Sequence, residues 1–354
     1  MPDTSIPPRH DRPGAPNGAP GFSIPAAALL AALALALAAA RQAPSVLDPS
    51  DAVRLAEAWR LADRLAKHLW AGWDGVPFAV LLVTPERELL IGHPRPGADF
   101  TGHGRDPLLD SEVFSRPRQF GTDLLATFPA VGGLPTIVVG RAESTAARTS
   151  TPWVATLLHE HFHQMQMSQP DYWSQVEALN LSGGDTSGQW MLDYPFPYEA
   201  SAPGAALQEL GRRLAEAIRA GDRDLDTCAD AYRRSRERFR LALSEPDYRY
   251  FAFQSWQEGI ARYTEYRMAD LAAREYRPSR RFREFPDVSL WGDVASALRK
   301  DILGALDDLR PTERRRVAFY AVGAGEGLLL DRLDSDWRSR YFAHPFDLGP
   351  LLAP

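Results

Sequence analysis

Cysteine is almost absent from this sequence of 354 residues, in which Cys228 is the only example. A single thiol excludes an intramolecular disulfide and a zinc site built from several cysteines. Because Cys228 lies in a run that predicts a helix, we expect it to be a small packed residue and not a nucleophile. Cysteine usage therefore leaves the redox compartment open.

An excess of positive charge is also missing. The formal net charge is −6 at pH 7 and the isoelectric point is about 5.8, which argues against nucleic acid as the main partner. The basic runs Arg277–Arg283 and Arg314–Arg316 are short, and they predict solvated helix ends or loops. With 45% hydrophobic and 24% charged residues, the composition is that of a globular protein with a sizeable core.

Charged residues are missing from one long stretch near the N-terminus. Residues 1–21 are rich in proline and glycine and predict a disordered segment. Residues 24–40 carry no charge, follow Arg9 and Arg12, and end in three alanines, as a secretory signal would. Residues 22–43 thus predict a cleaved signal peptide, with an uncleaved membrane anchor and a buried soluble helix as alternatives. Either of the first two places the rest of the chain in the periplasm or outside the cell, and an anchor would attach it to a membrane through residues 24–40.

The remaining sequence predicts a single α+β domain over residues 44–354, predominantly α-helical. A small mixed sheet is expected in residues 44–168 and a helical lobe in residues 169–354. Residues 92–134 are dense in glycine, proline and aspartate and predict loops. The expected strands are 78–83, 89–91 and 136–140, the first two forming a hairpin. The expected helices are 51–73, 151–168, 203–220, 226–243, 252–274, 290–309 and 312–333.

The motif HExxH lies within the expected helix 151–168 and consists of His159, Glu160 and His163. Residues four apart on a helix lie one turn above the other, so both imidazoles can reach one metal ion. Glu160 is rotated by about 100° from His159, which suits a general base that takes a proton from activated water and does not ligate the metal. We therefore predict His159 and His163 as zinc (Zn²⁺) ligands and Glu160 as the catalytic residue.

The HExxH pattern has an alternative interpretation, and two features of this helix bear on it. A five-letter pattern can arise by chance, and two histidines on a solvated face are the alternative interpretation. Thr151 as a cap and Pro152 at the first helical position mark a well-defined helix start. His161 falls on the apolar side of the helix, so we expect it to be buried and hydrogen-bonded.

A catalytic zinc site needs a third protein ligand. Glu258 is the best candidate, because Gly259 and Ala261 are small and allow another helix to approach closely. An exposed i,i+4 ion pair between Glu258 and Arg262 is the alternative interpretation. The other candidate ligands are Glu199, Asp193 and Glu265.

Two further predictions concern residues away from the motif. The segment Gly323–Gly327 has glycine at every second position and lies inside an expected helix. It therefore predicts close helix packing, not a phosphate-binding turn. An oxyanion would need a hydrogen-bond donor. The candidate donors are Tyr263, Tyr266, Arg262 and His344.

The sequence HEHFH at 159–163, followed by the ExxA pattern Glu258–Ala261, resembles the gluzincin metallopeptidases. The resemblance implies zinc bound by His159, His163 and Glu258, in a cleft between a mixed sheet and a helical lobe. It also implies that strand 136–140 is an edge strand offered to an extended peptide. The chain departs from many members in separation, since about 95 residues lie between His163 and Glu258. The expected helices within 203–243 would account for the gap.

The sequence therefore predicts an exported zinc-dependent metallopeptidase whose partner is a peptide or protein substrate. The alternative is a non-catalytic exported zinc-binding or scaffold protein that keeps this fold. An intact Glu160 disfavours the alternative, because a pure metal holder does not need a base at that position.

Overall fold

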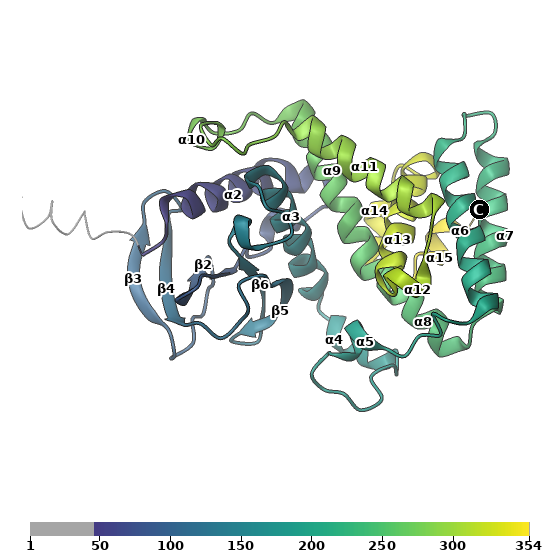
Figure 1. Cartoon of the computed structure of the whole chain (residues 1–354), viewed down its shortest axis with the longest axis horizontal. Coiled ribbons are helices and arrows are strands. Elements are labelled where there is room, and N and C mark those ends of the chain that lie inside the picture. The colour runs from purple at the N-terminus through teal and green to yellow at the C-terminus, as the bar shows by residue number, and fades with distance from the viewer. Residues whose placement is uncertain (1–45, 354) are drawn as a thin grey trace, which may run out of the picture. The chain divides into compact units, whose positions relative to one another are not determined.

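The computed structural model describes residues 46–353, which form one compact unit (Figure 1). The predicted disordered segment 1–21 and the predicted signal or anchor 22–43 lie outside the described residues. Within residues 46–353, no helix combines the length and apolar character needed to cross a bilayer.

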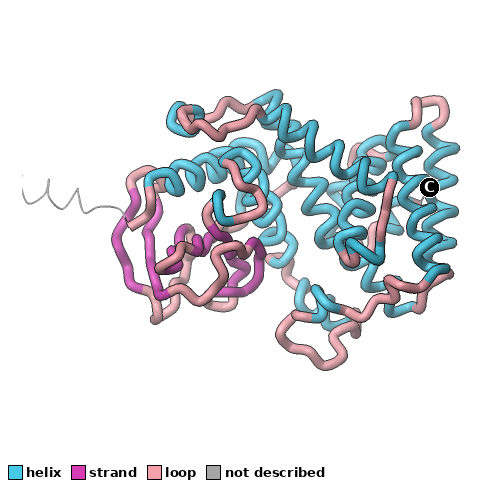
Figure 2. The backbone as a smooth tube through the Cα atoms, viewed as in Figure 1, coloured by secondary structure: helices cyan, strands magenta, loops and turns pink. Residues whose placement is uncertain are grey.

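The fold is α+β and predominantly α-helical, as predicted, with the strands gathered in one part of the chain (Figure 2). The strands are β1 (Val80–Val83), β2 (Arg87–Ile91), β3 (Thr101–Asp106), β4 (Ser111–Pro117), β5 (Leu125–Val131) and β6 (Leu134–Gly140). The longer helices are α2 (Pro49–Leu69), α3 (Ser150–Met167), α6 (Ser201–Arg219), α7 (Leu225–Leu241), α8 (Glu245–Gln254), α9 (Ile260–Glu275), α11 (Trp291–Asp307) and α13 (Val317–Leu333). The short helical elements are η1 (Trp73–Gly75), η2 (Ala142–Ser144), α4 (Tyr172–Ala178), α5 (Trp190–Asp193), η3 (Ser255–Gly259), α10 (Arg280–Arg283), α12 (Pro311–Arg314), α14 (Trp337–Arg340), η4 (Tyr341–Ala343) and α15 (Gly349–Leu352).

The six strands form one mixed sheet in the order β3-β4-β2-β1-β6-β5. β1 and β2 form the predicted antiparallel hairpin, and β1 runs parallel to β6, with Leu81 opposite Val138. Alternate side chains divide between the two faces, as strand geometry requires. Leu82 and Val139 join the main core with the helices, whereas Leu81 and Val138 join a smaller cluster on the other face.

Two sequence predictions about the strands are wrong. Residues 92–134 are not only loops, since they contain β3, β4 and β5. β3 and β5 are edge strands: β3 is almost wholly exposed, and β5 carries Pro129 where its register shifts, so neither shows the apolar alternation of a buried strand. Strand 136–140 is not an edge strand either, because β6 pairs with β1 on one side and β5 on the other.

Helix α3 packs against the sheet and carries the HExxH motif through the middle of the protein. The Trp153 indole N–H donates to the carbonyl of Gly140 at the end of β6 (3.0 Å), which fixes the helix against the sheet. The helix begins at Ser150, whose backbone N–H donates to the Asp287 carboxylate (2.9 Å). The predicted cap is wrong: the Thr151 hydroxyl donates to the carbonyl of Ser289 instead.

The helical lobe meets α3 through one long helical rod. α8, η3 and α9 follow one another without a break over residues 245–275, and α9 packs along α3. α13 crosses η3 and α9 from the other side. The predicted helix 252–274 thus corresponds to most of this rod, with a π-helical turn inside it that periodicity did not predict.

Candidate metal centre

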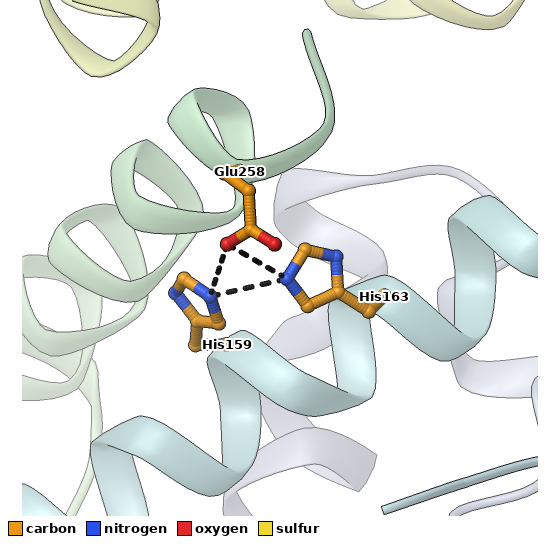
Figure 3. Close-up of side chains that lie close together, drawn as sticks. All are labelled: His159, His163 and Glu258. Carbon is orange, nitrogen blue, oxygen red and sulfur yellow. Dashed lines mark hydrogen bonds and ion pairs between the residues drawn. The ribbon is translucent and has the colours of Figure 1, made fainter. Parts of the chain in front are cut away.

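Three side chains from two elements converge on one point where α3 meets η3 (Figure 3). The Nε2 atoms of His159 and His163 lie 3.2 Å apart. The Oε2 atom of Glu258 lies 3.7 Å from His159 Nε2 and 3.5 Å from His163 Nε2. In residues 46–353, these are the only histidine, cysteine or acidic side chains that gather closely enough to hold a metal ion.

The spacing of the three atoms fits a zinc ion. Zinc–ligand bonds of about 2.0–2.1 Å at tetrahedral angles separate the ligand atoms by about 3.3–3.4 Å. The three observed separations, 3.2, 3.5 and 3.7 Å, bracket that value. Two imidazoles and one carboxylate also form the type of donor set that leaves a fourth position open in catalytic zinc sites.

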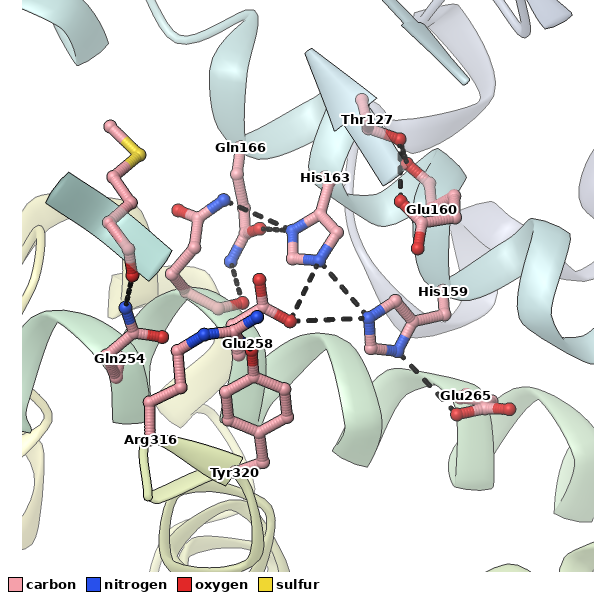
Figure 4. A network of polar contacts seen from close by, with 12 residues as sticks. Thr127, His159, Glu160, His163, Gln166, Gln254, Glu258, Glu265, Arg316 and Tyr320 are labelled. Atoms are coloured by element: carbon pink, nitrogen blue, oxygen red, sulfur yellow. Dashed lines mark hydrogen bonds and ion pairs between the residues drawn. The ribbon is translucent and has the colours of Figure 1, made fainter. Parts of the chain in front are cut away.

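The Nδ1 atom of each histidine, which faces away from the cluster, contacts a further polar side chain (Figure 4). His163 Nδ1 donates to Gln166 Oε1 at 2.7 Å, which leaves the Nε2 lone pair facing the cluster. His159 Nδ1 lies 3.6 Å from the Glu265 carboxylate. Glu265, one of the candidate ligands, therefore reaches the opposite side of the imidazole and orients it.

Glu258 owes its position to the π-helical turn η3. A π turn inserts a residue into a helix and leaves backbone carbonyls without their usual partners, and such turns are frequent at functional sites. Here the Gln166 amide donates to the carbonyl of Gln257 (3.0 Å), and the Tyr341 hydroxyl donates to the carbonyl of Trp256 (2.8 Å). One side chain, Gln166, thus orients His163 and supports the turn that presents Glu258.

The predicted close packing at Gly323–Gly327 is confirmed, and it lies directly behind this turn. A Cβ atom on Gly323 would lie 2.0 Å from the carbonyl oxygen of Ser255. A Cβ atom on Gly259 would lie 2.5 Å from the Cα atom of Gly323. Both glycines are therefore required for α13 to approach η3.

We expect Gly323→Ala to destabilise the fold by about 1–3 kcal/mol, because the added methyl group overpacks a backbone contact. It should also weaken zinc binding, since η3 would have to move. Gly204→Ala in α6 is the matched control, because nothing lies within 4 Å of its Cβ position. Urea unfolding and a zinc titration of both variants would check this. Equal stability of the two would show that the contact is not tight.

Glu160 is buried and oriented from the sheet. The Thr127 hydroxyl on β5 lies 2.9 Å from Glu160 Oε2 and 3.0 Å from the Glu160 carbonyl oxygen. Figure 4 shows this carboxylate beside the cluster and not within it. Glu160 thus holds a fixed position next to the two histidines, as a general base requires.

Electrostatics hold the cluster together. Burial lowers the pKa of His159, but hydrogen bonds to Glu258 and Glu265 outweigh it and raise that pKa to about 10. Burial acts to raise the pKa of Glu258, but the two imidazoles reverse this and hold it well below its usual range. Glu258 is therefore an ionised carboxylate, the form that binds a cation.

Sequence reasoning missed two residues of this site, Arg316 and Tyr320. Figure 4 shows both side chains reaching Glu258 from the start of α13, where they also contact each other. Burial raises the pKa of Tyr320 well above its ordinary value, and the Glu258 carboxylate adds to the effect. The i,i+4 spacing of Arg316 and Tyr320 was visible in the sequence, but the run 314–316 was interpreted as solvated, which is wrong for Arg316.

Arg316 also holds α5 near the cluster. Its Nε atom donates to the carbonyl of Leu192 at 3.1 Å. The Gln254 amide and the Tyr250 hydroxyl donate to the neighbouring carbonyl of Met191. The segment around α5 is therefore fixed beside the site by its backbone.

Several predicted residues lie elsewhere or are already engaged. The Tyr263 hydroxyl donates to Asp331 (2.8 Å), so it is not free to serve an oxyanion. Among the described residues, Glu199 and Asp193 are exposed and do not join the metal cluster, and Tyr266 and His344 form no hydrogen bond to it. The alternative interpretation, an ion pair between Glu258 and Arg262, is not found within the described chain, because Glu258 faces the two histidines. Among the described residues, Arg262 forms no hydrogen bond to the cluster either.

The prediction for His161 is confirmed. It is buried, its Nδ1 lies 2.8 Å from Gln164 Oε1, and its ring stacks on Phe78 with 4.0 Å between ring centroids. Burial lowers its pKa to about 4, so the ring is neutral at pH 7. His161 is therefore part of the packing behind the motif.

No protein-family model matches this chain, and neither a curated protein nor a solved structure matches it. What the site can do is therefore argued from its own geometry.

Proposed function

We propose that this chain is an exported zinc-dependent metallopeptidase. The observation that carries the proposal is the convergence of His159 Nε2, His163 Nε2 and Glu258 Oε2 within 3.7 Å of one another, beside a buried carboxylate. When bound there, zinc would act as a Lewis acid that polarises the scissile carbonyl and lowers the pKa of the attacking water.

The chain's own residues would perform the proton transfers. Glu160 would accept a proton from the attacking water and return it to the leaving amine. The Thr127 hydroxyl would keep the Glu160 carboxylate turned toward that water, since it binds one carboxylate oxygen and leaves the other free. Tyr320 would donate a hydrogen bond to the developing oxyanion, because its oxygen accepts from Arg316 and its own O–H stays available as a donor.

The sheet edge supports a peptide as substrate. β5 pairs only with β6, so its other edge has no partner strand among the described residues. An extended peptide can add to such an edge through backbone hydrogen bonds. Thr127 lies on β5 and contacts Glu160, so a peptide on that edge would pass next to the base. The same contact argues against a purely zinc-binding role.

The test combines metal analysis with a peptide-library digest of purified protein. We expect about one zinc per chain, hydrolysis of peptide bonds, loss of activity with a chelator and its return with added zinc. Zinc binding without cleavage of any library peptide would favour the non-catalytic alternative. Absence of zinc binding would overturn both.

Tyr320→Phe should lower kcat by about tenfold to a hundredfold while changing KM little, because the hydroxyl acts in the transition state. Tyr276→Phe is a matched control, since that hydroxyl donates to Glu57 away from the cluster. Steady-state kinetics on one library substrate would separate kcat from KM. An unchanged kcat for Tyr320→Phe would remove this residue from the mechanism.

Export rests on the uncharged run 24–40. We expect the mature protein to begin soon after Ala40, because signal peptidase cleaves after small residues. N-terminal sequencing of the protein from the exporting host would measure this. Recovery of intact Met1 in a soluble cytoplasmic fraction would refute export.

A further inference from the structure

A surface pocket of about 500 Å³ opens next to the metal centre. Four helices contribute to it: α9, α11, α12 and α13. Its charged lining consists of Arg262, Lys300 and Arg314, with Asp301 as the only acid. The pocket therefore carries two excess positive charges on a chain whose net charge is −6.

The three cations of this pocket differ from nearby arginines in their ion pairing. Other arginines nearby are paired: Arg274 with Asp270 on α9, and Arg310 with Asp308 before α12. Within residues 46–353, neither Arg262, Lys300 nor Arg314 forms an ion pair, although Asp301 lines the same pocket. Three unpaired cations around one concave surface suit an anionic ligand.

Two residues connect the pocket to the metal centre. Tyr320 lines the pocket, and its side chain also reaches Glu258 (Figure 4). Arg262 follows Glu258 by four residues on the same rod, which places it about 6 Å further along the helix axis. An extended peptide advances about 3.3 Å per residue, so this offset corresponds to about two residues from the scissile bond.

We propose that this pocket binds a carboxylate of the peptide substrate, located within about three residues of the cleaved bond. This inference rests on the proposed peptidase function. The carboxylate is either the C-terminal group of the peptide or an acidic side chain. Arginine provides paired N–H donors that match the geometry of a carboxylate, and lysine adds a point charge.

The experiment uses sets of peptides that differ only in charge. One library substrate is made as the free acid and as the C-terminal amide, and with glutamate or glutamine at each of the three positions on either side of the cleaved bond. We expect kcat/KM to be at least about tenfold higher for one carboxylate form, mainly through KM. Dependence on acid against amide assigns the C-terminal group, and dependence on glutamate against glutamine assigns the side chain.

The variant is the triple substitution Arg262→Gln, Lys300→Gln and Arg314→Gln. It should remove the preference for the carboxylate form while changing kcat/KM for the neutral peptide by less than about twofold. The control for overall charge is a second triple substitution, Arg277→Gln, Arg281→Gln and Arg283→Gln, at exposed residues outside the pocket, and it should keep the preference. Equal loss on charged and neutral peptides, or no preference in the wild type, would overturn the proposal.

A binding measurement separates this proposal from the peptidase function. Fluorescence anisotropy with labelled acid and amide peptides on the Glu160→Gln variant needs no turnover. Tighter binding of the carboxylate form, lost in the triple variant, would support the pocket even if no peptide were cleaved. Cleavage without charge preference would leave the peptidase in place and refute the pocket.

Discussion

Glu160→Gln should leave about one zinc bound per chain while lowering turnover by about a thousandfold. The amide cannot accept a proton from the attacking water, and general-base catalysis contributes about 10²–10⁴-fold. Zinc should stay, because Glu160 is hydrogen-bonded to Thr127 and does not join the three atoms of the cluster. Metal analysis and kcat on the same preparation would measure both effects.

Two further variants sharpen this result. Thr127→Val removes the hydroxyl that holds Glu160 and should cause a smaller loss of kcat, with zinc content unchanged. Glu177→Gln on α4 removes an exposed carboxylate and should change neither quantity. Near-normal peptide hydrolysis by Glu160→Gln would refute the mechanism, whatever the zinc content.

The HExxH helix could be predicted from sequence because all of its information is local. The spacing of His159 and His163 decides that both imidazoles lie on one side, and the structure places their Nε2 atoms 3.2 Å apart. The same reasoning put His161 on the packed side, where it stacks on Phe78. Periodicity identified the long helices for the same reason.

The rest of the site depends on contacts between segments far apart in the chain. The π turn η3 is stabilised by Gln166 and Tyr341, which lie about 90 residues before it and 80 after it. No local pattern marks such a turn. The sequence still indicated Glu258, because its neighbour Gly259 is small. Gly259 permits the close approach of α13 that fixes the turn.

These wrong predictions have one cause, which is that a local sequence pattern does not record contacts with segments far away in the chain. Edge strands β3 and β5 are held by backbone pairing with one neighbour and bury few side chains, so their sequences lack apolar alternation. Arg316 was assigned to a solvated run because the basic run 314–316 is short. Its actual contacts, Tyr320 and the carbonyl of Leu192, depend on how α5 and α13 pack.

Glu258→Ala should weaken zinc binding by more than about a hundredfold and abolish turnover. Its Oε2 atom is the only carboxylate oxygen among the described residues that faces both Nε2 atoms. Loss of a residue that only orients a ligand costs about 10–100-fold in affinity, so loss of a direct ligand should exceed that range. Competition titration with a chelator would measure the affinities.

Glu265→Ala provides the graded comparison, because Glu265 contacts His159 through Nδ1 and not through the metal-facing nitrogen. We expect a loss of about tenfold for Glu265→Ala. We expect none for Asp270→Ala, which breaks only ion pairs with Arg267 and Arg274 on the same helix, each worth about 0–1 kcal/mol. His159→Ala and His163→Ala should each lose zinc. If those two lost zinc while Glu258→Ala kept wild-type affinity, Glu258 would not be the third ligand. A larger loss for Glu265→Ala than for Glu258→Ala would instead show that the His159 ring is flipped, so that Nδ1 binds the metal and Glu265 completes the site.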